Sequence, residues 1–335
     1  MTVHIGLIGC GIVSRSHARG YQANDGRVSV PAVADVLPEA AAARAAQLGA
    51  TAYQDYRDLL ARSDIDAVDI CLPHHLHADA VVAAAEAGKH VLCEKPLCLT
   101  PREADRIARA VTASGVTLMC AHNALYLPAV AAAKKLLSAG ALGRVYELRT
   151  TDSFRNDYDP AALGWRADRR TNGGGELIDT GYHPTYLLLH LAGDRPSEVT
   201  AMLSRHRLSF MDGEDSARML VRFAGGAVGE VVTSWAYDAP PHAEKFSVLG
   251  ERGTLWSDGT TLRVALDGNA PEVRSFPETD TTAAEIAAFA DCLRDGTRPL
   301  HGVEEGTDVL TVILAAYRAV EERRVIALAE MAVAA

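Results

Sequence analysis

The sequence has none of the features that mark a membrane-spanning or nucleic-acid-binding protein. No apolar run approaches the roughly 18 residues that a bilayer crossing requires, and positive charge is in short supply. The 33 lysines and arginines are outnumbered by 43 aspartates and glutamates, which gives a formal net charge of −10. Because DNA, RNA and anionic lipid attract a positive field, we expect no nucleic-acid or membrane partner.

Patterns that direct secretion or bind metal are also missing. The chain runs from Met1 directly into an apolar segment, without the basic stretch, apolar core and cleavage site of a leader, so we expect a cytoplasmic protein. Cys71 lies near His74, His75 and His77, but no CxxC pair or HExxH helix accompanies them, and we expect no metal. We interpret the six cysteines as reduced core thiols.

The first third of the chain alternates short apolar runs with amphipathic segments. The runs are rich in Val, Ile, Leu and Cys, as is typical of parallel strands buried on both faces. We predict strands at residues 3–8, 28–34, 67–72, 91–93 and 116–120, and helices at residues 38–48, 77–87 and 101–113. Pro38 and Pro101 suit a first helical turn, and Thr100 suits an N-cap. The alternation predicts a doubly wound parallel α/β domain, a Rossmann fold, over residues 1–123.

From residue 124 onward the predicted strands become longer and alternate more clearly. We predict strands at residues 145–151, 199–208, 219–223, 227–237, 245–249 and 262–266, and helices at residues 129–139, 283–294 and 303–323. The pair Gly225-Gly226 is typical of a hairpin. We therefore expect residues 124–335 to form an α+β domain with a large, mostly antiparallel sheet. Its last helices would pack on that sheet or back on the first domain.

A glycine turn after the first predicted strand indicates a dinucleotide site. Gly9 would turn the chain, Gly11 would let the backbone approach the pyrophosphate, and Ser14 takes the place of the third small residue. Ile12 and Val13 lie where a helix N-terminus offers amide donors to phosphate. The turn alone is weak evidence, because glycine turns are common.

Asp35 indicates which dinucleotide binds. It ends the predicted second strand, about where an acid that bonds the ribose hydroxyls is expected. A carboxylate there repels the 2′-phosphate of NADP, and neither Val36 nor Leu37 supplies a compensating arginine. We therefore predict NAD rather than NADP; the alternative is a solvated acid at a strand end.

Lys95 is the first candidate for catalysis. It follows a buried predicted strand in the run Glu94-Lys95-Pro96, at the sheet edge where such folds bind ligands. Its ammonium can donate to a hydroxyl or carbonyl oxygen and stabilise developing negative charge. The alternative is a surface lysine or a partner of Glu94.

Asp179 and His183 form the second candidate pair. Four residues apart, they share a face if the segment is helical. Imidazole is the usual general base near neutral pH, and a carboxylate can orient it. Pro184 disfavours helical geometry at His183, so this interpretation needs a helix that begins near Asp179. The alternative is an aspartate cap and a core histidine.

Polar and aromatic residues near predicted strand ends and the domain junction complete the candidate site. The further cofactor candidates are Leu72, Pro73, His74, His77, Glu94 and Asn123, besides Lys95 itself. The histidines could instead cap the following helix. The further substrate candidates, besides the catalytic three, are Tyr126, Arg155, Trp165 and Arg166. An aromatic ring with polar donors suits a sugar face, although Trp165 could equally be a core residue.

Several longer runs resemble the Gfo/Idh/MocA oxidoreductases, the family of glucose–fructose oxidoreductase and inositol dehydrogenase. They are the glycine turn with His17 after it, residues 72–77, residues 87–97 around Glu94-Lys95-Pro96, residues 173–175 with Asp179 and His183, and residues 285–289 with Ala316-Tyr317. The likeness covers essentially the whole chain. Three positions depart from the family pattern: His74 often is Asn, Leu125 replaces an expected arginine, and Tyr186 replaces a frequent acid.

The resemblance implies a Rossmann domain followed by a domain with an open sheet that typically forms an oligomer interface, giving a homodimer or homotetramer. It also implies catalysis by Lys95, Asp179 and His183 on sugars, cyclitols or their derivatives.

Three functions follow as hypotheses. The leading one is NAD-dependent hydride transfer between a secondary alcohol of a sugar, amino-sugar or cyclitol and nicotinamide. The second is transient oxidation by the same residues that permits cleavage of a glycosidic bond or an elimination. The third is a non-catalytic regulator that binds a dinucleotide.

Overall fold

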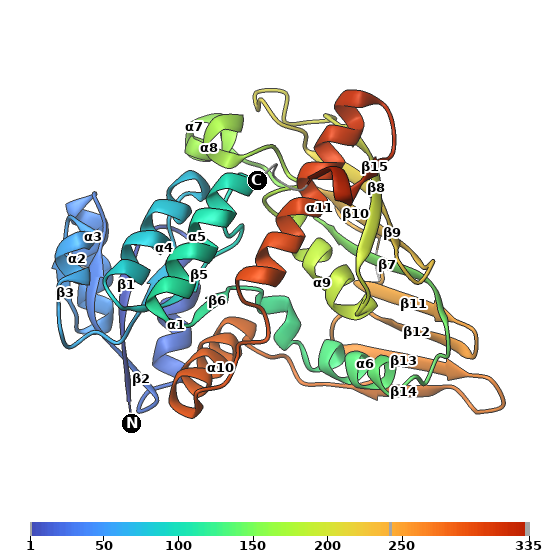
Figure 1. The fold of residues 1–335 in the computed structure, drawn as a ribbon, viewed down its shortest axis with the longest axis horizontal. Helices are drawn as coiled ribbons and strands as arrows, with labels where there is room; N and C mark the ends of the chain where they lie inside the picture. Colours follow the sequence, from blue (N-terminus) through green and yellow to red (C-terminus); the bar gives the residue numbers. More distant parts are fainter. Residues whose placement is uncertain (1, 241–242, 332–335) are drawn as a thin grey trace. The chain divides into compact units, whose positions relative to one another are not determined.

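The computed structural model describes residues 2–240 and 243–331, with the side chains of residues 161 and 162 left aside. The chain forms two compact units, Met1–Asn123 with Asp280–Thr307, and Ala124–Thr279 with Asp308–Ala335 (Figure 1). Residues 280–307 thus belong to the first unit, whereas the sequence pattern assigns residues 124–335 to one second domain whose last helices pack on either part.

The first unit is built on six parallel strands in the order β3-β2-β1-β4-β5-β6. They are β1 (Val3–Ile8), β2 (Val28–Ala34), β3 (Thr51–Tyr53), β4 (Ala67–Ile70), β5 (His90–Cys93) and β6 (Leu118–Cys120). All four residues of β4 are buried, and so is most of β1. Such burial explains why these strands read as near-continuous apolar runs. The predicted doubly wound sheet is confirmed.

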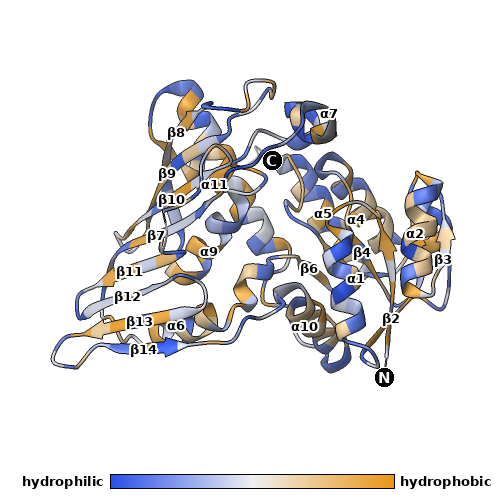
Figure 2. Cartoon of the chain, turned by 180° about the vertical axis from the view of Figure 1, so that it is seen from behind, coloured by the Kyte–Doolittle hydropathy of each residue, from blue (hydrophilic) through white to orange (hydrophobic). Residues whose placement is uncertain are grey.

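The first unit also contains helices, most of which connect these strands. They are α1 (Ser14–Ala23), α2 (Pro38–Leu48), α3 (Tyr56–Leu60), α4 (His77–Glu86), α5 (Pro101–Ser114) and α10 (Thr281–Asp295), with the 3-10 turn η1 (His74–Leu76). The helix α10 comes later in the chain and packs on α1. The strand order runs outward from β1 in both directions, so right-handed crossovers place α1 and α2 on one face and α4 and α5 on the other. Figure 2 shows both hydrophilic and hydrophobic colours on α2 and α5, as expected of amphipathic helices. Thr100 caps α5 in a capping box with Glu103, as predicted.

The second unit contains a nine-stranded sheet in the order β14-β13-β12-β11-β7-β10-β9-β8-β15. The strands are β7 (Val145–Ser153), β8 (Pro196–Ser204), β9 (Ser216–Phe223), β10 (Val228–Ser234), β11 (Phe246–Gly250), β12 (Gly253–Ser257), β13 (Thr261–Leu266), β14 (Glu272–Ser275) and β15 (Ile326–Ala327). Only β7 and β10 pair in parallel; the other pairs that the structure describes in this sheet are antiparallel. The predicted mostly antiparallel sheet is confirmed, and β9 joins β10 through Gly225-Gly226.

The second unit also contains helices, some of which lie against the sheet. They are α6 (Pro128–Ser138), α7 (Pro160–Leu163), α8 (Arg169–Asn172) and α9 (Tyr182–Ala192), with the 3-10 turns η2 (Asn123–Tyr126), η3 (Gly164–Ala167) and η4 (Leu328–Met331), and α11 (Val303–Glu322) begins in the first unit and ends in the second. The helix α9 packs on β7 and β10, and α6 contacts α9 and β13 (Figure 1). Along β9, exposed Arg218, Leu220 and Arg222 alternate with buried residues, so the other face of this strand is polar and exposed.

Two further sequence expectations concern helices and cysteines. Among the described residues, no helix combines the length and the apolar character that a bilayer crossing would need. All six cysteines are free thiols, and all except Cys292 are buried.

Candidate active site

The glycine turn has the geometry that a dinucleotide site requires. Gly9 has a φ of +95°, and a Cβ there would lie 2.4 Å from the carbonyl oxygen of Cys71, so no other residue fits. A Cβ on Gly11 would meet nothing within 4 Å, and this residue is exposed, which leaves its backbone open to a ligand. Ile12 and Val13 follow, and α1 begins at Ser14. These residues fit the pyrophosphate of a bound dinucleotide.

Asp35 lies directly beside this turn. Its carboxylate accepts hydrogen bonds from the backbone N–H groups of Cys10, at 2.7 Å, and Leu37, at 2.9 Å. The side chain therefore ties the end of β2 to the turn after β1. That is the position from which an acid reaches the ribose hydroxyls of NAD.

The strand end after β4 is braced by His77. This buried ring lies between two carbonyl oxygens, with Nδ1 2.7 Å from the oxygen of Pro96 and Nε2 2.8 Å from that of Leu72. Burial lowers the pKa of His77, although the two carbonyl groups oppose the shift. His74 is buried in η1 with its ring 5.9 Å from that of His77, and Pro73 is partly buried. His77 thus joins the loop after β4 to the segment that follows Lys95. Direct contact of Leu72, Pro73, His74 and His77 with the cofactor stays a prediction.

Lys95 follows a hydrogen-bonded network of buried ionisable groups. Its backbone N–H donates to Glu94 Oε2 at 3.0 Å, and Glu94 Oε1 lies 3.0 Å from Nε2 of His17. Nδ1 of His17 lies 2.7 Å from Asp69 Oδ2, and the hydroxyl of Tyr21 donates to the same carboxylate. Burial, the largest influence, lowers the pKa of His17, but Asp69 and Cys71 outweigh it and hold that pKa well above its usual value. The imidazolium therefore lies between two carboxylates and fixes Glu94, next to Lys95.

Cys71 and Glu285 adjoin this network. One possible metal-ligand atom from each of His17, Asp69 and Cys71 lies within 4.8 Å of the other two. Both ring nitrogens of that histidine contact carboxylates, so we interpret the group as a hydrogen-bonded network. Glu285 of α10 is fully buried, and neither carboxyl oxygen has a hydrogen-bond partner among the described residues. Burial, the largest cause, and Glu94 raise the pKa of Glu285 well above its ordinary value, which favours the protonated carboxyl.

The substitution Glu285→Gln is expected to change how stability depends on pH. The unfolded chain releases the Glu285 proton near pH 4.5, whereas the folded chain retains it, so the free energy of unfolding falls by up to about 1.4 kcal/mol per pH unit above pH 4.5. Glutamine removes this loss, and the variant should gain stability over the native protein as pH rises from 5 to 8. Urea unfolding at both pH values measures the difference, with exposed Glu278→Gln as the control. An equal difference at both pH values would contradict the buried, protonated state.

In the second unit, Asp179 forms an ion pair with Arg166. Oδ2 of the buried carboxylate accepts from Nε of Arg166 at 2.9 Å. The same guanidinium lies over the ring of Trp165, with its central carbon 4.3 Å from the ring centroid. Arg166, a predicted substrate residue, thus contacts a predicted catalytic residue, and Trp165 contacts Arg166 in turn. The Trp165 ring is stacked on a cation rather than enclosed in the core.

The expectation of a helix that begins near Asp179 is wrong. The helix α9 begins at Tyr182, and Asp179 precedes it in a turn that its own N–H closes with the carbonyl of Glu176, at 3.1 Å. The physical reason is Pro184, whose missing N–H and steric demand are tolerated only in a first helical turn. His183 is therefore the second residue of the helix, where side chains are well fixed.

Tyr186 holds the ring of His183. The phenol oxygen lies 2.8 Å from Nδ1 of His183, and it accepts the backbone N–H of Ala124 at 3.0 Å. Tyr186 is fully buried and His183 is partly exposed. If Nδ1–H donates to the phenol oxygen, Nε2 is the unprotonated nitrogen of the neutral ring. Tyr186 thus supplies the orienting partner that a histidine base needs.

The glycine-rich segment before Asp179 is packed against two buried acids. A Cβ on Gly175 would lie 2.2 Å from the carbonyl oxygen of Glu214, so the close approach requires glycine. The N–H of Gly175 donates to the hydroxyl of Tyr317 at 3.2 Å, and that hydroxyl donates to Glu214 at 2.9 Å. Burial is the largest cause that raises the pKa of both Glu176 and Glu214. These contacts set the path of the chain that delivers Asp179.

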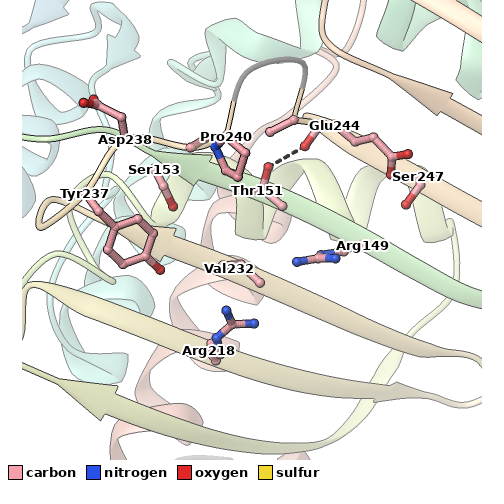
Figure 3. A pocket seen from close by; sticks show the side chains of 12 residues that line it. Arg149, Thr151, Ser153, Arg218, Val232, Tyr237, Asp238, Pro240, Glu244 and Ser247 are labelled. Carbon is pink, nitrogen blue, oxygen red and sulfur yellow. Dashed lines mark hydrogen bonds between the residues drawn. The ribbon is translucent and has the colours of Figure 1, made fainter.

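Arg155, Asn123 and Tyr126 are the remaining predicted site residues. Arg155 is exposed and pairs with Asp157 at 3.3 Å. Asn123 and Tyr126 lie in η2, partly exposed, at the boundary between the units. A hollow of about 680 Å³ lies on β7, β9, β10 and β11 beside Tyr237 (Figure 3). Its walls include Arg149 and Arg218, and they contain none of the predicted site residues.

Several residues of this arrangement escape sequence reasoning. Asp69 and Tyr21 read as ordinary strand and helix positions, because the bonds of Asp69 with His17 and Tyr21 depend on the fold. The burial of Glu285 depends on the fold as well. Tyr186 carries a signal, since it departs from the family pattern three residues after His183.

Comparison with known proteins agrees with this fold. Residues 3–122 match the family described as "Oxidoreductase family, NAD-binding Rossmann fold", and residues 130–256 match the "GFO/IDH/MocA C-terminal domain". The protein is thus an NAD-binding oxidoreductase acting on CH–OH groups. It belongs to the Gfo/Idh/MocA family, as the resemblance indicates.

Individual relatives span nearly the same length. The chain is 31% identical over 308 residues to the levoglucosan dehydrogenase of Pseudarthrobacter phenanthrenivorans, covering 82% of this chain and 79% of the relative. It is 32% identical over 327 residues to D-xylose 1-dehydrogenase (NADP(+)) 2 of Haloferax volcanii, covering 94% and 97%. A solved structure of levoglucosan dehydrogenase in complex with NADH and levoglucosan is 27% identical, with a TM-score of 0.90 over 98% of this chain and 100% of that one.

Proposed function

We propose that the protein transfers a hydride reversibly between a secondary alcohol of a sugar or cyclitol and NAD, with Lys95 and His183 as the catalytic residues. The observation that carries this proposal is the set of hydrogen bonds around these two residues. Lys95 directly follows a glutamate fixed by His17, and His183 is held at Nδ1 by Tyr186 so that Nε2 can act as a base.

The proposed chemistry assigns one task to each residue. NAD, when bound, supplies the hydride acceptor. Nε2 of His183 takes the hydroxyl proton, so the alcohol becomes a ketone as its C–H hydrogen leaves with two electrons. The ammonium of Lys95 donates to the same oxygen and stabilises its developing charge. Asp179, paired with Arg166 at 2.9 Å, contributes negative charge that favours the protonated imidazole.

The substrate class follows from the relatives and from the residues beside Asp179. Trp165 and Arg166 offer an aromatic face and a cation, a combination that suits a hydroxyl-rich ring. The relatives named above are dehydrogenases of levoglucosan and D-xylose. We therefore propose a free sugar, anhydro-sugar or cyclitol as the substrate, in preference to an amino-sugar.

A substrate screen tests this proposal. The full-length protein is incubated with NAD and, in turn, levoglucosan, D-xylose, myo-inositol and glucosamine, and NADH is followed by its absorbance. We expect NADH to accumulate with at least one of the first three. Product formation from catalytic NAD without NADH accumulation would indicate transient oxidation instead. Tight NADH binding without turnover on any compound would indicate the regulator.

We also propose that the protein forms a homo-oligomer through the exposed face of the nine-stranded sheet. Met202, Tyr146, Leu220 and Leu249 on four strands of this sheet are between 39% and 80% exposed. Exposed apolar side chains among polar ones are typical of interfaces. Sedimentation equilibrium that gives the mass of a single chain, 35.6 kDa, would refute this assembly.

A further inference from the structure

The first unit contains a hollow that the proposed chemistry does not use. It lies between α1 and α2, with a volume of about 500 Å³. Arg15 and Arg19 line it from α1, Arg44 and Gln47 from α2, and Cys10 from the glycine turn. Three guanidinium groups thus face one small space in a chain whose net charge is −10.

These three arginines differ from most others in the protein. Many arginines of the described chain form ion pairs, such as Arg106 with Asp79 and Arg62 with Asp64. Within residues 2–240 and 243–331, Arg15, Arg19 and Arg44 have no carboxylate within 4.0 Å. The side-chain hydrogen bonds that the described guanidinium groups of the three make are to neutral partners: Arg19 donates to the Ser16 hydroxyl at 3.1 Å, and Arg44 donates to Gln47.

Arg44 is the buried member of the three arginines. Its side chain is only 8% exposed, and its buried Nε has no hydrogen-bond partner among the described atoms. A buried guanidinium without a counter-charge is costly, because it loses hydration and gains no pairing. An anion in the hollow would provide that pairing.

The position of the hollow indicates which ligand could carry this anion. Its wall includes Cys10, whose backbone N–H donates to Asp35 at 2.7 Å. Burial, the largest cause, raises the pKa of the Cys10 thiol to about 12; Asp35 adds to the rise and Arg44 opposes it. The carboxylate of Asp35 and the guanidinium of Arg44 therefore both lie near the thiol of Cys10. The hollow adjoins the acid expected to contact the adenosine ribose.

We infer that Arg15, Arg19 and Arg44 bind a phosphate on the 2′ oxygen of that ribose, so that the protein accepts NADP as well as NAD. This inference rests on the proposed dinucleotide site. Guanidinium groups bind phosphate oxygens through paired N–H donors, and three positive charges outweigh the single charge of Asp35. The compensating arginines missing after Asp35 in the sequence are therefore supplied by α1 and α2.

Binding of adenosine nucleotides tests the inference without any turnover. The full-length protein is titrated calorimetrically at pH 8 and low salt with 5′-AMP, adenosine 2′,5′-bisphosphate and inorganic phosphate. At this pH the added phosphate carries close to two negative charges. We expect the bisphosphate to bind about fivefold more tightly than 5′-AMP, a modest gain because Asp35 opposes it. Equal or weaker binding of the bisphosphate would overturn the inference.

Variants show whether the arginines are responsible. Arg15→Gln and Arg19→Gln change exposed side chains and should fold normally. Each should weaken binding of the bisphosphate about fivefold while 5′-AMP stays within about twofold. Arg44→Met should remove the preference altogether, with folding checked by thermal melting. Arg109→Gln, an exposed position on α5 that pairs with Asp105, is the control and should change neither ligand.

The outcomes separate this inference from the proposed function. If the bisphosphate preference depends on the arginines but no sugar is oxidised, the phosphate site stands and the dehydrogenase assignment fails. If inorganic phosphate binds in an arginine-dependent way while the bisphosphate gains nothing over 5′-AMP, the hollow takes a free anion and the inference is overturned.

Discussion

Replacing Lys95 by methionine is expected to lower kcat by at least about a hundredfold on the substrate found in the screen. Methionine retains the length and apolar stem of the side chain but removes the ammonium that we propose as the donor to the reacting oxygen. Loss of one preorganised donor of this kind typically lowers the rate by a factor of about 10² to 10³. The measurement is the initial rate of NADH formation at saturating NAD and sugar.

The control for this variant is Lys135→Met, at an exposed position of α6. It removes the same charge and should leave kcat unchanged. Both variants should melt within a few degrees of the native protein, because Lys95 is only partly buried and follows a fully formed strand. A Lys95→Met enzyme that keeps kcat within threefold of the native value would remove this residue from the mechanism.

The substitution His183→Asn is expected to lower kcat by about a thousandfold near neutral pH. Asparagine can still bond with Tyr186 but cannot take a proton, and a positioned general base contributes a factor of about 10² to 10⁴. The native rate of alcohol oxidation should fall toward acidic pH, because protonation of the imidazole disables the base. The variant should lose this acidic limb. A pH–rate profile for alcohol oxidation from pH 5 to 9 measures both effects.

Tyr186→Phe separates positioning from proton transfer at the same site. The phenol oxygen contacts both Nδ1 of His183 and the N–H of Ala124, so its removal frees the ring to rotate and leaves a buried amide unpaired. We expect kcat to fall about tenfold with little change in KM, while the acidic limb persists. Tyr146→Phe, on an exposed part of β7, should have no effect. An unchanged kcat in Tyr186→Phe would show that another group orients His183.

Much of the first unit could be predicted because burial on both faces of a sheet leaves a clear pattern. Residues 3–8 and 28–34 are predicted and observed as β1 and β2 with the same ends. The helix at residues 38–48 is likewise found as α2, since Pro38 favours a first turn and Gly49 adopts the left-handed conformation that ends it. In both cases local preference and tertiary packing favour the same structure.

Other features could not be predicted because long-range contacts decide them. The strands β3 and β14 are short, and their side chains are mostly exposed, so they lack an apolar signal. The segment of Gly175 and Asp179 takes its path from Glu214 and Tyr317, residues 39 and 142 positions away from Gly175 in the sequence. The basic hollow beside the glycine turn is hidden in the sequence for a similar reason, since its arginines lie on two helices.

The division of the chain has a consequence for recombination between relatives. The cofactor-binding half is encoded in two separate stretches, residues 1–123 and residues 280–307. A chimera that exchanges only the first stretch would leave α10, which packs against α1, from the wrong parent. The third boundary between the units falls inside α11, five residues after its start. A functional hybrid gene therefore needs three crossovers, and the last must preserve the helical phase of α11.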